Sequence, residues 1–164
     1  KQKTAYEIYQ CDWSSDVCSS DLVAFGRHVC NYSDANSTEL DPNTTHPIVD
    51  LLPEQKTVSN MGGSLRLGAH DITIKPNTIA HKTYSSDHVA RRHRHRYEIN
   101  TKYLEAFEKN GLIFSAESDN SKRMEMLEIP SHKFYFGVQF HPEFNSRPGF
   151  PEESFEAFIR ASAS

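Results

Sequence analysis

The chain has 164 residues, of which 37% are hydrophobic and 24% charged, a composition typical of one globular domain. Its formal net charge of -4, from 18 basic and 22 acidic residues, excludes the overall positive field that binds nucleic acid non-specifically. No stretch approaches the roughly 20 apolar residues of a membrane-spanning helix, and the N-terminus lacks the apolar core of a signal peptide. We therefore expect a cytoplasmic protein with neither nucleic acid nor membrane as a partner.

The first 22 residues, KQKTAYEIYQCDWSSDVCSSDL, show no apolar periodicity. Their last part, DWSSDVCSSDL, resembles the translation of a DNA-sequencing adaptor. We expect residues 1–22 to be non-native and not to pack against the rest of the chain; the alternative is a natural polar arm. Residues 23–164 then form the domain, with Cys30 as its single cysteine.

The domain begins inside an element, because residues 23–30 have the pattern of the end of an amphipathic helix. Residues 31–53 are rich in Asn, Asp, Ser, Thr and Pro, which predicts a long loop. In residues 61–68 and 71–75, apolar and polar side chains alternate as in β-strands, and a short Gly-Ala-His turn is expected between the two stretches. A hairpin or two neighbouring strands are expected there.

The second half of the chain predicts more strands than helices. Residues 97–100 form a short strand candidate, and Asn100 is placed to cap a helix over residues 102–110 that ends at Gly111. Three further strands are expected over residues 112–116, 124–129 and 134–140, followed by a last helix over residues 152–161. The pattern predicts an α/β layer fold that is incomplete at its N-terminal side.

The strand predicted over residues 134–140 ends at His141, Pro142 and Glu143. Open α/β sheets place their sites at the carboxyl ends of strands. Two residues apart on an extended chain, the imidazole of His141 and the carboxylate of Glu143 lie on the same side. The carboxylate then accepts a ring N–H, fixes the tautomer and stabilises the imidazolium. Taken alone, a His-x-Glu pair is more often a surface histidine beside a solvated acid.

An unusual run of alternating arginine and histidine occupies residues 91–96. Nucleic-acid binding is disfavoured because no second basic or aromatic stretch accompanies the run. A metal site at His93 and His95 is disfavoured because the interleaved arginines repel a cation and no third ligand lies near in the sequence. A guanidinium instead matches both oxygens of a substrate carboxylate.

The string GVQFHPEF around His141 resembles the motif of class I glutamine amidotransferases, which hydrolyse the side-chain amide of glutamine with a Cys-His-Glu triad. With DANSTELDPN, MGGSLRLGA, RRHRHRYEIN and GVQFHPEFNSRP, the chain is similar to the CTP synthase family in particular, from about Val23 to its C-terminus. The resemblance implies an open, largely parallel sheet of the flavodoxin-like type.

The same resemblance implies the partners of the whole enzyme. In that family an amidoligase domain, absent from this chain, uses ATP and Mg²⁺ to aminate UTP to CTP, and GTP stimulates the release of ammonia from L-glutamine. The family assembles into homo-tetramers. No cofactor or metal is implied for the segment in hand.

The resemblance also implies roles for four residues. His141 is the triad base and Glu143 the acid that orients it. Arg96, the last arginine of the run, and Glu39, in DANSTEL, are implied to bind the substrate glutamine, Glu39 at its α-ammonium group. Without the resemblance, Glu39 is better explained as a loop carboxylate that accepts backbone N–H groups.

The nucleophile is the main departure from the family pattern. The family's Gly-x-Cys-x-Gly elbow falls about a dozen residues before Arg27, where Cys11 and Cys18 lack flanking glycines. Cys30 has the context of a buried, small apolar residue. We therefore expect this chain alone to be inactive. The alternatives are a free-standing amidotransferase or gamma-glutamyl hydrolase relative, and a non-catalytic binding or regulatory module without the cysteine.

Overall fold

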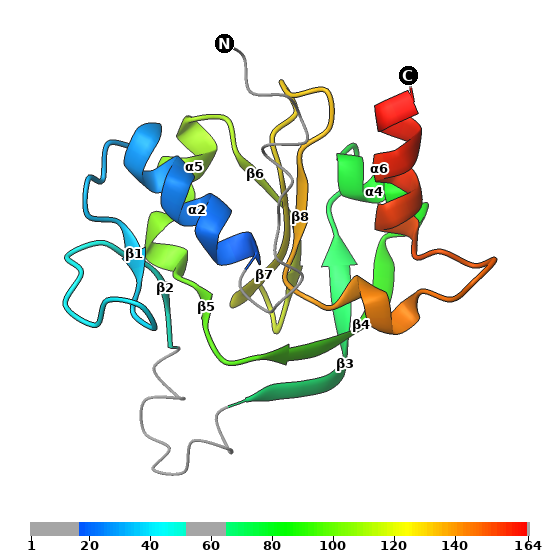
Figure 1. The fold of residues 1–164 in the computed structure, drawn as a ribbon, viewed down its shortest axis with the longest axis horizontal. Coiled ribbons are helices and arrows are strands. Elements are labelled where there is room, and N and C mark those ends of the chain that lie inside the picture. Colours follow the sequence, from blue (N-terminus) through cyan, green and yellow to red (C-terminus); the bar gives the residue numbers. More distant parts are fainter. Residues whose placement is uncertain (1–16, 52–64, 164) are drawn as a thin grey trace.

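The larger sheet of the computed structural model, which describes residues 17–51 and 65–163, has five described strands (Figure 1). In spatial order they are β4 (His88–His95), β3 (Arg66–Ile74), β6 (Ile113–Ser118), β7 (Arg123–Glu128) and β8 (Phe136–Val138). All neighbouring pairs are antiparallel. Short connections such as residues 119–122 between β6 and β7 account for this, because a parallel pair needs a long crossover.

A smaller described sheet lies beside it, with strands in the order β1 (Asn36–Ser37), β2 (Pro47–Asp50) and β5 (Glu98–Ile99). β1 and β2 are parallel, whereas β2 and β5 are antiparallel. The predicted α/β class is confirmed, and among the described strands the parallel arrangement is seen between β1 and β2. The loop predicted over residues 31–53 contains two short strands that its polar composition conceals.

Helices cover both faces of the larger sheet (Figure 1). On one side lie α2 (Val17–His28) and α5 (Leu104–Lys109), the latter continuing the 3-10 turn η2 (Thr101–Tyr103). On the other side lie α4 (Ile79–Tyr84) and α6 (Glu153–Ala163). Among the described residues, no helix combines the length and apolarity needed to span a bilayer.

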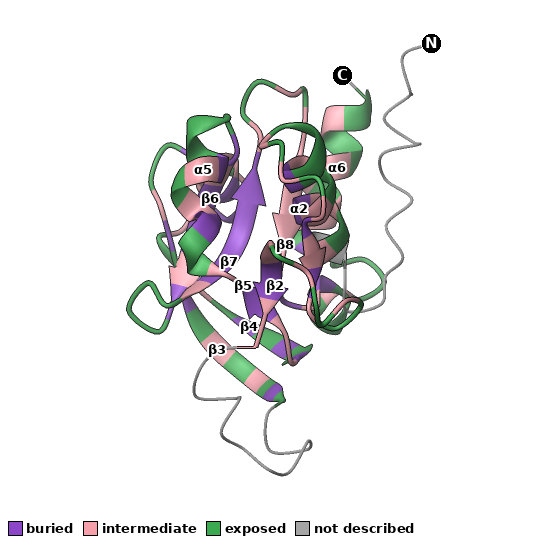
Figure 2. Ribbon diagram, turned by 90° about the vertical axis from the view of Figure 1, so that its left-hand side faces the viewer, coloured by how far each residue is buried: buried purple, intermediate pink, exposed green. Residues whose placement is uncertain are grey.

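The larger sheet separates two hydrophobic clusters, and β7 contributes side chains to both of them. Leu127 packs with Phe107 and Phe114 in one cluster, whereas its neighbour Met126 packs with Ile72 in the other. Successive residues of a strand face opposite sides of a sheet, so a strand covered on both faces is buried throughout. Figure 2 shows this for β7, whereas burial alternates along β3.

The helix α2 crosses the predicted boundary between residues 22 and 23. The helix begins at Val17, and Leu22 is fully buried with Ile48 and Phe107. Leu22 lies one helical turn before Phe25, which packs against the same cluster, so the expectation of no packing is wrong for this residue. Residues 1–16 lie outside the described residues, and the non-native origin of the segment stays a prediction.

The hairpin predicted around Gly68 is also corrected. β3 runs without interruption from Arg66 to Ile74 and pairs with β4 along its length, from Arg66 opposite His95 to Thr73 opposite His88. Gly68 has a φ of 91°, which glycine adopts at little cost, so the strand continues through it. The first part of the predicted strand, residues 61–64, lies outside the described residues.

The remaining predicted elements are close to those observed. The side chain of Asn100 accepts the N–H of Lys102 and caps η2, and Gly111, with a φ of 91°, follows the end of α5. β8 is shorter than predicted, and α6 runs two residues further. The helix α4, whose N-terminus is capped by Thr78, is not among the predicted elements.

Candidate active site

His141 and Glu143 are brought together as the sequence predicts. His141 lies three residues after β8 and directly precedes the 3-10 turn η3 (Pro142–Asn145). Its Nδ1 is 2.7 Å from Oε1 of Glu143. Since an ionised carboxylate only accepts hydrogen bonds, Nδ1 carries the proton and Nε2 keeps the lone pair. The His141 side chain is 14% exposed, so Nε2 belongs to a largely enclosed imidazole that can act as a base.

The backbone around His141 is held from both sides. Its N–H donates to the carbonyl of Arg92 in β4 at 3.0 Å, and its carbonyl accepts the N–H of Phe144. Pro142 begins η3, where a missing N–H costs nothing. Phe140, 3% exposed, anchors the preceding residue in the core. The dyad therefore lies on a segment fixed to the edge strand of the larger sheet.

Gln139, which is not among the predicted site residues, also holds this segment. Its backbone N–H donates to the carbonyl of Glu125 at 2.8 Å, and its side-chain Nε2 donates to the carbonyl of Tyr97 at 3.3 Å. Its position two residues before His141 was the available signal in the sequence.

Arg96 follows the end of β4 and is half-buried, with its guanidinium carbon 5.9 Å from the centre of the Tyr97 ring. Its neighbour Tyr97 bonds to Gln139, and Arg92 on the same segment bonds to His141. Arg96 thus belongs to the segment against which the His141 segment is held.

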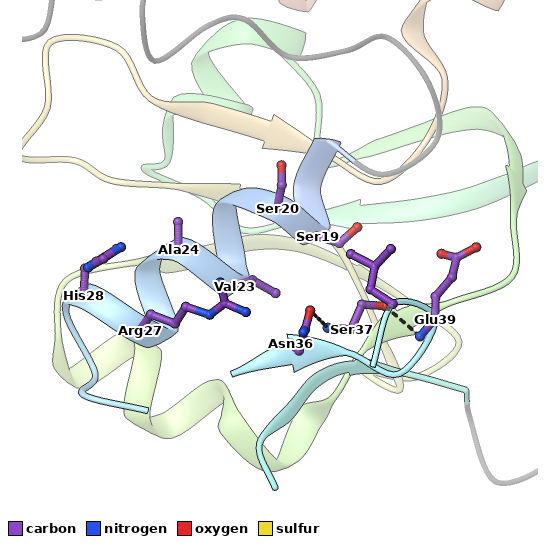
Figure 3. A pocket seen from close by; sticks show the side chains of 10 residues that line it. Ser19, Ser20, Val23, Ala24, Arg27, His28, Asn36, Ser37 and Glu39 are labelled. Atoms are coloured by element: carbon purple, nitrogen blue, oxygen red, sulfur yellow. Dashed lines mark hydrogen bonds between the residues drawn. The ribbon is translucent and has the colours of Figure 1, made fainter. Parts of the chain in front are cut away.

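Glu39 is exposed in the loop after β1, and its backbone N–H donates to Oγ of Ser37 at 3.2 Å. It lines a pocket of about 430 Å³ between α2 and the β1 segment (Figure 3). Figure 3 shows Glu39 at one end of this pocket and His28 at the other. Among the described residues that line it are Arg27 and Asn36, but none of the other three predicted site residues.

The arginine-histidine run alternates across β4. His93 and His95 are buried together with Arg91, whereas Arg92 and Arg94 are exposed. Within the part of the chain that the structure describes, no group of three His, Cys, Asp or Glu residues could hold a metal ion. The histidines of the run belong instead to a buried polar network.

Glu125 of β7 is the centre of this buried network. Its carboxylate accepts hydrogen bonds from Arg66 Nη1 at 2.7 Å, from His93 Nε2 at 2.8 Å and from the hydroxyl of Ser118. Burial alone raises the pKa of Glu125, but the bonds from His93 and the charge of Arg66 outweigh it and lower the pKa to about 2. Four strands are thereby joined through one carboxylate.

His95 and Glu98 lie next to this network. Burial, followed by the charges of His93 and Arg66, lowers the pKa of His95 to about 3, so its ring is neutral at pH 7. Nδ1 of His95 lies 3.0 Å from the carbonyl of Tyr97, to which the neutral ring donates. Burial raises the pKa of Glu98 to about 7, against the opposing charges of Arg66 and Arg123.

Cys30 is half-buried, and its Sγ lies 3.8 Å from the carbonyl of Ala106. Burial raises the pKa of this thiol, whereas a nucleophilic thiol requires a lowered one. Its environment matches the structural role that the sequence predicts.

Comparison with known proteins identifies the family. Residues 22–161 match the family model for class-I glutamine amidotransferases. The chain is 57% identical over 141 residues to the CTP synthase of Archaeoglobus fulgidus, covering 86% of this chain and 26% of that protein. It is 52% identical over 140 residues to the CTP synthase of Staphylococcus saprophyticus, covering 85% of this chain and 26% of the relative.

Among solved structures, the chain is similar to the glutaminase domain of Trypanosoma brucei CTPS with bound acivicin. The TM-score is 0.83 at 40% sequence identity, over 89% of this chain and 57% of that chain. The chain spans about a quarter of the length of the curated relatives named above. The resemblance found in the sequence is therefore confirmed: the chain belongs to the class-I glutamine amidotransferase family and matches the glutaminase portion of CTP synthases.

Proposed function

We propose that this chain is part of the glutamine-hydrolysing site of a CTP synthase, which supplies ammonia for the ATP-dependent amination of UTP to CTP. The observation that carries the proposal is the 2.7 Å contact between His141 Nδ1 and Glu143 Oε1. It leaves Nε2 as the proton acceptor on a segment whose backbone is fixed at several points. This is the geometry that a base–acid pair of a hydrolytic triad requires.

In the proposed reaction, Nε2 of His141 takes the proton of a cysteine thiol as the thiolate attacks the amide carbon of glutamine. The imidazolium then returns the proton to the departing nitrogen, ammonia leaves, and water hydrolyses the thioester to glutamate. Glu143 holds the ring in its tautomer and offsets the imidazolium charge. The thiol is proposed to come from an elbow upstream of residue 23, because burial raises the pKa of the half-buried Cys30, whose Sγ lies against the carbonyl of Ala106.

Arg96 and Glu39 are proposed to bind the two ends of the amino-acid part of glutamine. A guanidinium pairs with the α-carboxylate, and a carboxylate accepts hydrogen bonds from the α-ammonium. The connection of the Arg96 segment to the His141 segment through Gln139 supports the first assignment. The exposed position of Glu39 beside a pocket supports the second.

The amidoligase reaction, its ATP, Mg²⁺ and GTP, and the tetramer are proposed for the whole enzyme. Residues 23–164 serve as the ammonia-producing part, and by themselves they lack the nucleophile. A cysteine-less binding module is the alternative, and the two differ in whether supplying the upstream half restores hydrolysis.

The test joins the upstream part of the Archaeoglobus fulgidus relative, including its nucleophile, to residues 23–164 of this chain. We call this fusion the restored enzyme. Glutamate formation from glutamine is then measured for the restored enzyme and for the chain alone. The proposal predicts glutamate release by the restored enzyme and none by the chain alone. A restored enzyme that folds but releases no glutamate would favour the binding module.

A further inference from the structure

The carbonyl of Tyr97 joins the proposed catalytic segment to the proposed substrate-binding segment. It accepts the side-chain amide of Gln139 at 3.3 Å and lies 3.0 Å from Nδ1 of His95. A carbonyl oxygen has two lone pairs and can accept both donors. Arg96 lies between His95 and Tyr97, so the contact between those two residues fixes the backbone on both sides of Arg96.

The segment that carries His141 depends on individual hydrogen bonds because it has left the sheet. β8 ends at Val138, and beyond it the ladder to β7 no longer provides regular pairing. The backbone N–H groups of Gln139 and His141 reach Glu125 and Arg92, respectively. The side-chain amide of Gln139 adds a bond from this segment to the carbonyl of Tyr97, beside Arg96, and the same nitrogen lies 3.3 Å from Nδ1 of His95.

Gln139 is held at two points just before His141, by its backbone N–H on Glu125 and by its side-chain amide on Tyr97. Gln139 and Phe140 form a bend after β8, and His141 follows them in an extended conformation. Phe140 is buried near Tyr84 and His93, with ring centres 6.4 and 6.2 Å away. With Phe140 fixed in the core, the Gln139 amide restricts rotation of the segment that leads to His141.

We propose that Gln139 is a positioning residue that holds the His141–Glu143 pair in register with Arg96 by donating its side-chain amide to the carbonyl of Tyr97. The inference rests on the proposed function for its catalytic meaning. The effect of Gln139 on the tautomer of the His141 ring does not depend on that function and can be measured in the 164-residue chain. If Gln139 had only a structural role, replacing it would change the stability of the chain but not the tautomer of the His141 ring.

The first test is an NMR measurement of the histidine ring nitrogens in the chain with and without Gln139→Met. This substitution keeps the length of the side chain and removes the donor. In the unchanged chain, His141 should show the tautomer with the proton on Nδ1, bonded to Glu143. In the variant, the ratio of this tautomer to the other should fall by about tenfold, the factor that corresponds to one neutral hydrogen bond of about 1.4 kcal/mol.

Asn110→Leu is the matched control. The Asn110 amide donates to the carbonyl of Ala106 at 2.8 Å, a bond of the same kind at the end of α5. The control should leave the His141 tautomer unchanged. If Gln139→Met fails to fold, the same measurement is made on Gln139→Glu, because an ionised carboxylate of the same shape cannot donate a hydrogen bond to the carbonyl of Tyr97. An unchanged His141 tautomer in a folded Gln139 variant overturns the proposal.

The restored enzyme separates this inference from the proposed function. In the restored enzyme, Gln139→Met should lower kcat and raise the KM for glutamine. Together these changes should lower kcat/KM about tenfold. Ammonia-dependent CTP formation should remain unchanged. If His141→Ala leaves glutamine use intact, the proposed function fails, whatever Gln139→Met does to the tautomer. If His141→Ala abolishes glutamine use but Gln139→Met changes neither kinetics nor tautomer, the positioning role fails alone.

Discussion

The backbone N–H of His141 donates to the carbonyl of Arg92 at 3.0 Å, which fastens the segment after β8 to the edge strand β4. An edge strand has backbone groups without a strand partner on one side. Here one of them serves to hold the imidazole that the proposed reaction needs. The same strand leads directly to Arg96, so one edge of the sheet carries both parts of the proposed site.

Replacing Arg96 by alanine in the restored enzyme should chiefly weaken the binding of glutamine. A charged hydrogen bond to the substrate carboxylate contributes about 1.5–3 kcal/mol, so the KM should rise by roughly one to two orders of magnitude. Arg94→Ala is the control, because Arg94 is an exposed arginine of the same run. Steady-state kinetics with glutamine measure the effect. Equal kinetics for both variants and the unchanged enzyme would mean that Arg96 does not bind glutamine.

Glu125→Gln should destabilise the chain strongly. The carboxylate is fully buried and offsets the charge of Arg66, so removing its charge leaves a buried guanidinium without its counter-ion. Breaking a buried pair in this way costs about 3–5 kcal/mol of unfolding free energy. Denaturant unfolding measures the loss, with Glu108→Gln on the exposed side of α5 as the control. A loss no larger than that of the control would show that the network contributes no stability.

The stability of the fold should depend on pH through His95. Its pKa is lowered from 6.5 to about 3 in the folded chain, so the unfolded chain takes up a proton first as the pH falls. The contribution of the neutral ring is therefore full above pH 6.5 and is lost progressively towards pH 3. Glu98 acts in the opposite sense, because its raised pKa of about 7 removes stability as the pH rises from 4.5 to 7.

The contribution of His95 is isolated by comparison with His95→Asn, in which the amide nitrogen replaces Nδ1 as the donor to Tyr97. Melting temperatures of both proteins are measured between pH 8 and pH 4. The unchanged chain should lose stability relative to the variant as the pH falls below 6.5. Parallel curves across the range would contradict a strongly lowered pKa for this histidine.

Local patterns in the sequence predicted most of the second half of the fold. Asn100 and Gly111 bound a helix by mechanisms that act within a few residues, and the elements after them lie close to their predicted positions. By contrast, the local sequence around Gly68 predicts a turn, because the pairing of β3 with β4 that carries the strand through this residue is not visible in one segment. The burial of Leu22 likewise depends on partners distant in sequence.

In the candidate site, too, contacts between residues close in sequence could be predicted, whereas contacts between distant residues could not. His141 and Glu143 are two residues apart, so their contact follows from strand geometry. The bond from Gln139 to Tyr97 joins residues 42 positions apart, and the pair of His93 and Glu125 joins residues 32 apart. Such pairs become visible only once the order of strands in the sheet is known. The alternation of arginine and histidine matches the buried and exposed faces of β4, but the run itself does not reveal that the carboxylate of Glu125 faces His93.

The most direct test of the account is His141→Ala in the restored enzyme, assayed for CTP formation once with glutamine and once with free ammonia. Loss of the base should lower glutamine-dependent formation by several orders of magnitude, on the order of 10⁴ or more for a triad member. Added ammonia bypasses the amide hydrolysis, so ammonia-dependent formation should persist. Glu143→Ala should show the same pattern with a smaller loss, because Glu143 orients the base. Equal loss with both nitrogen donors would contradict the account and would mean that His141 supports the fold or a domain contact.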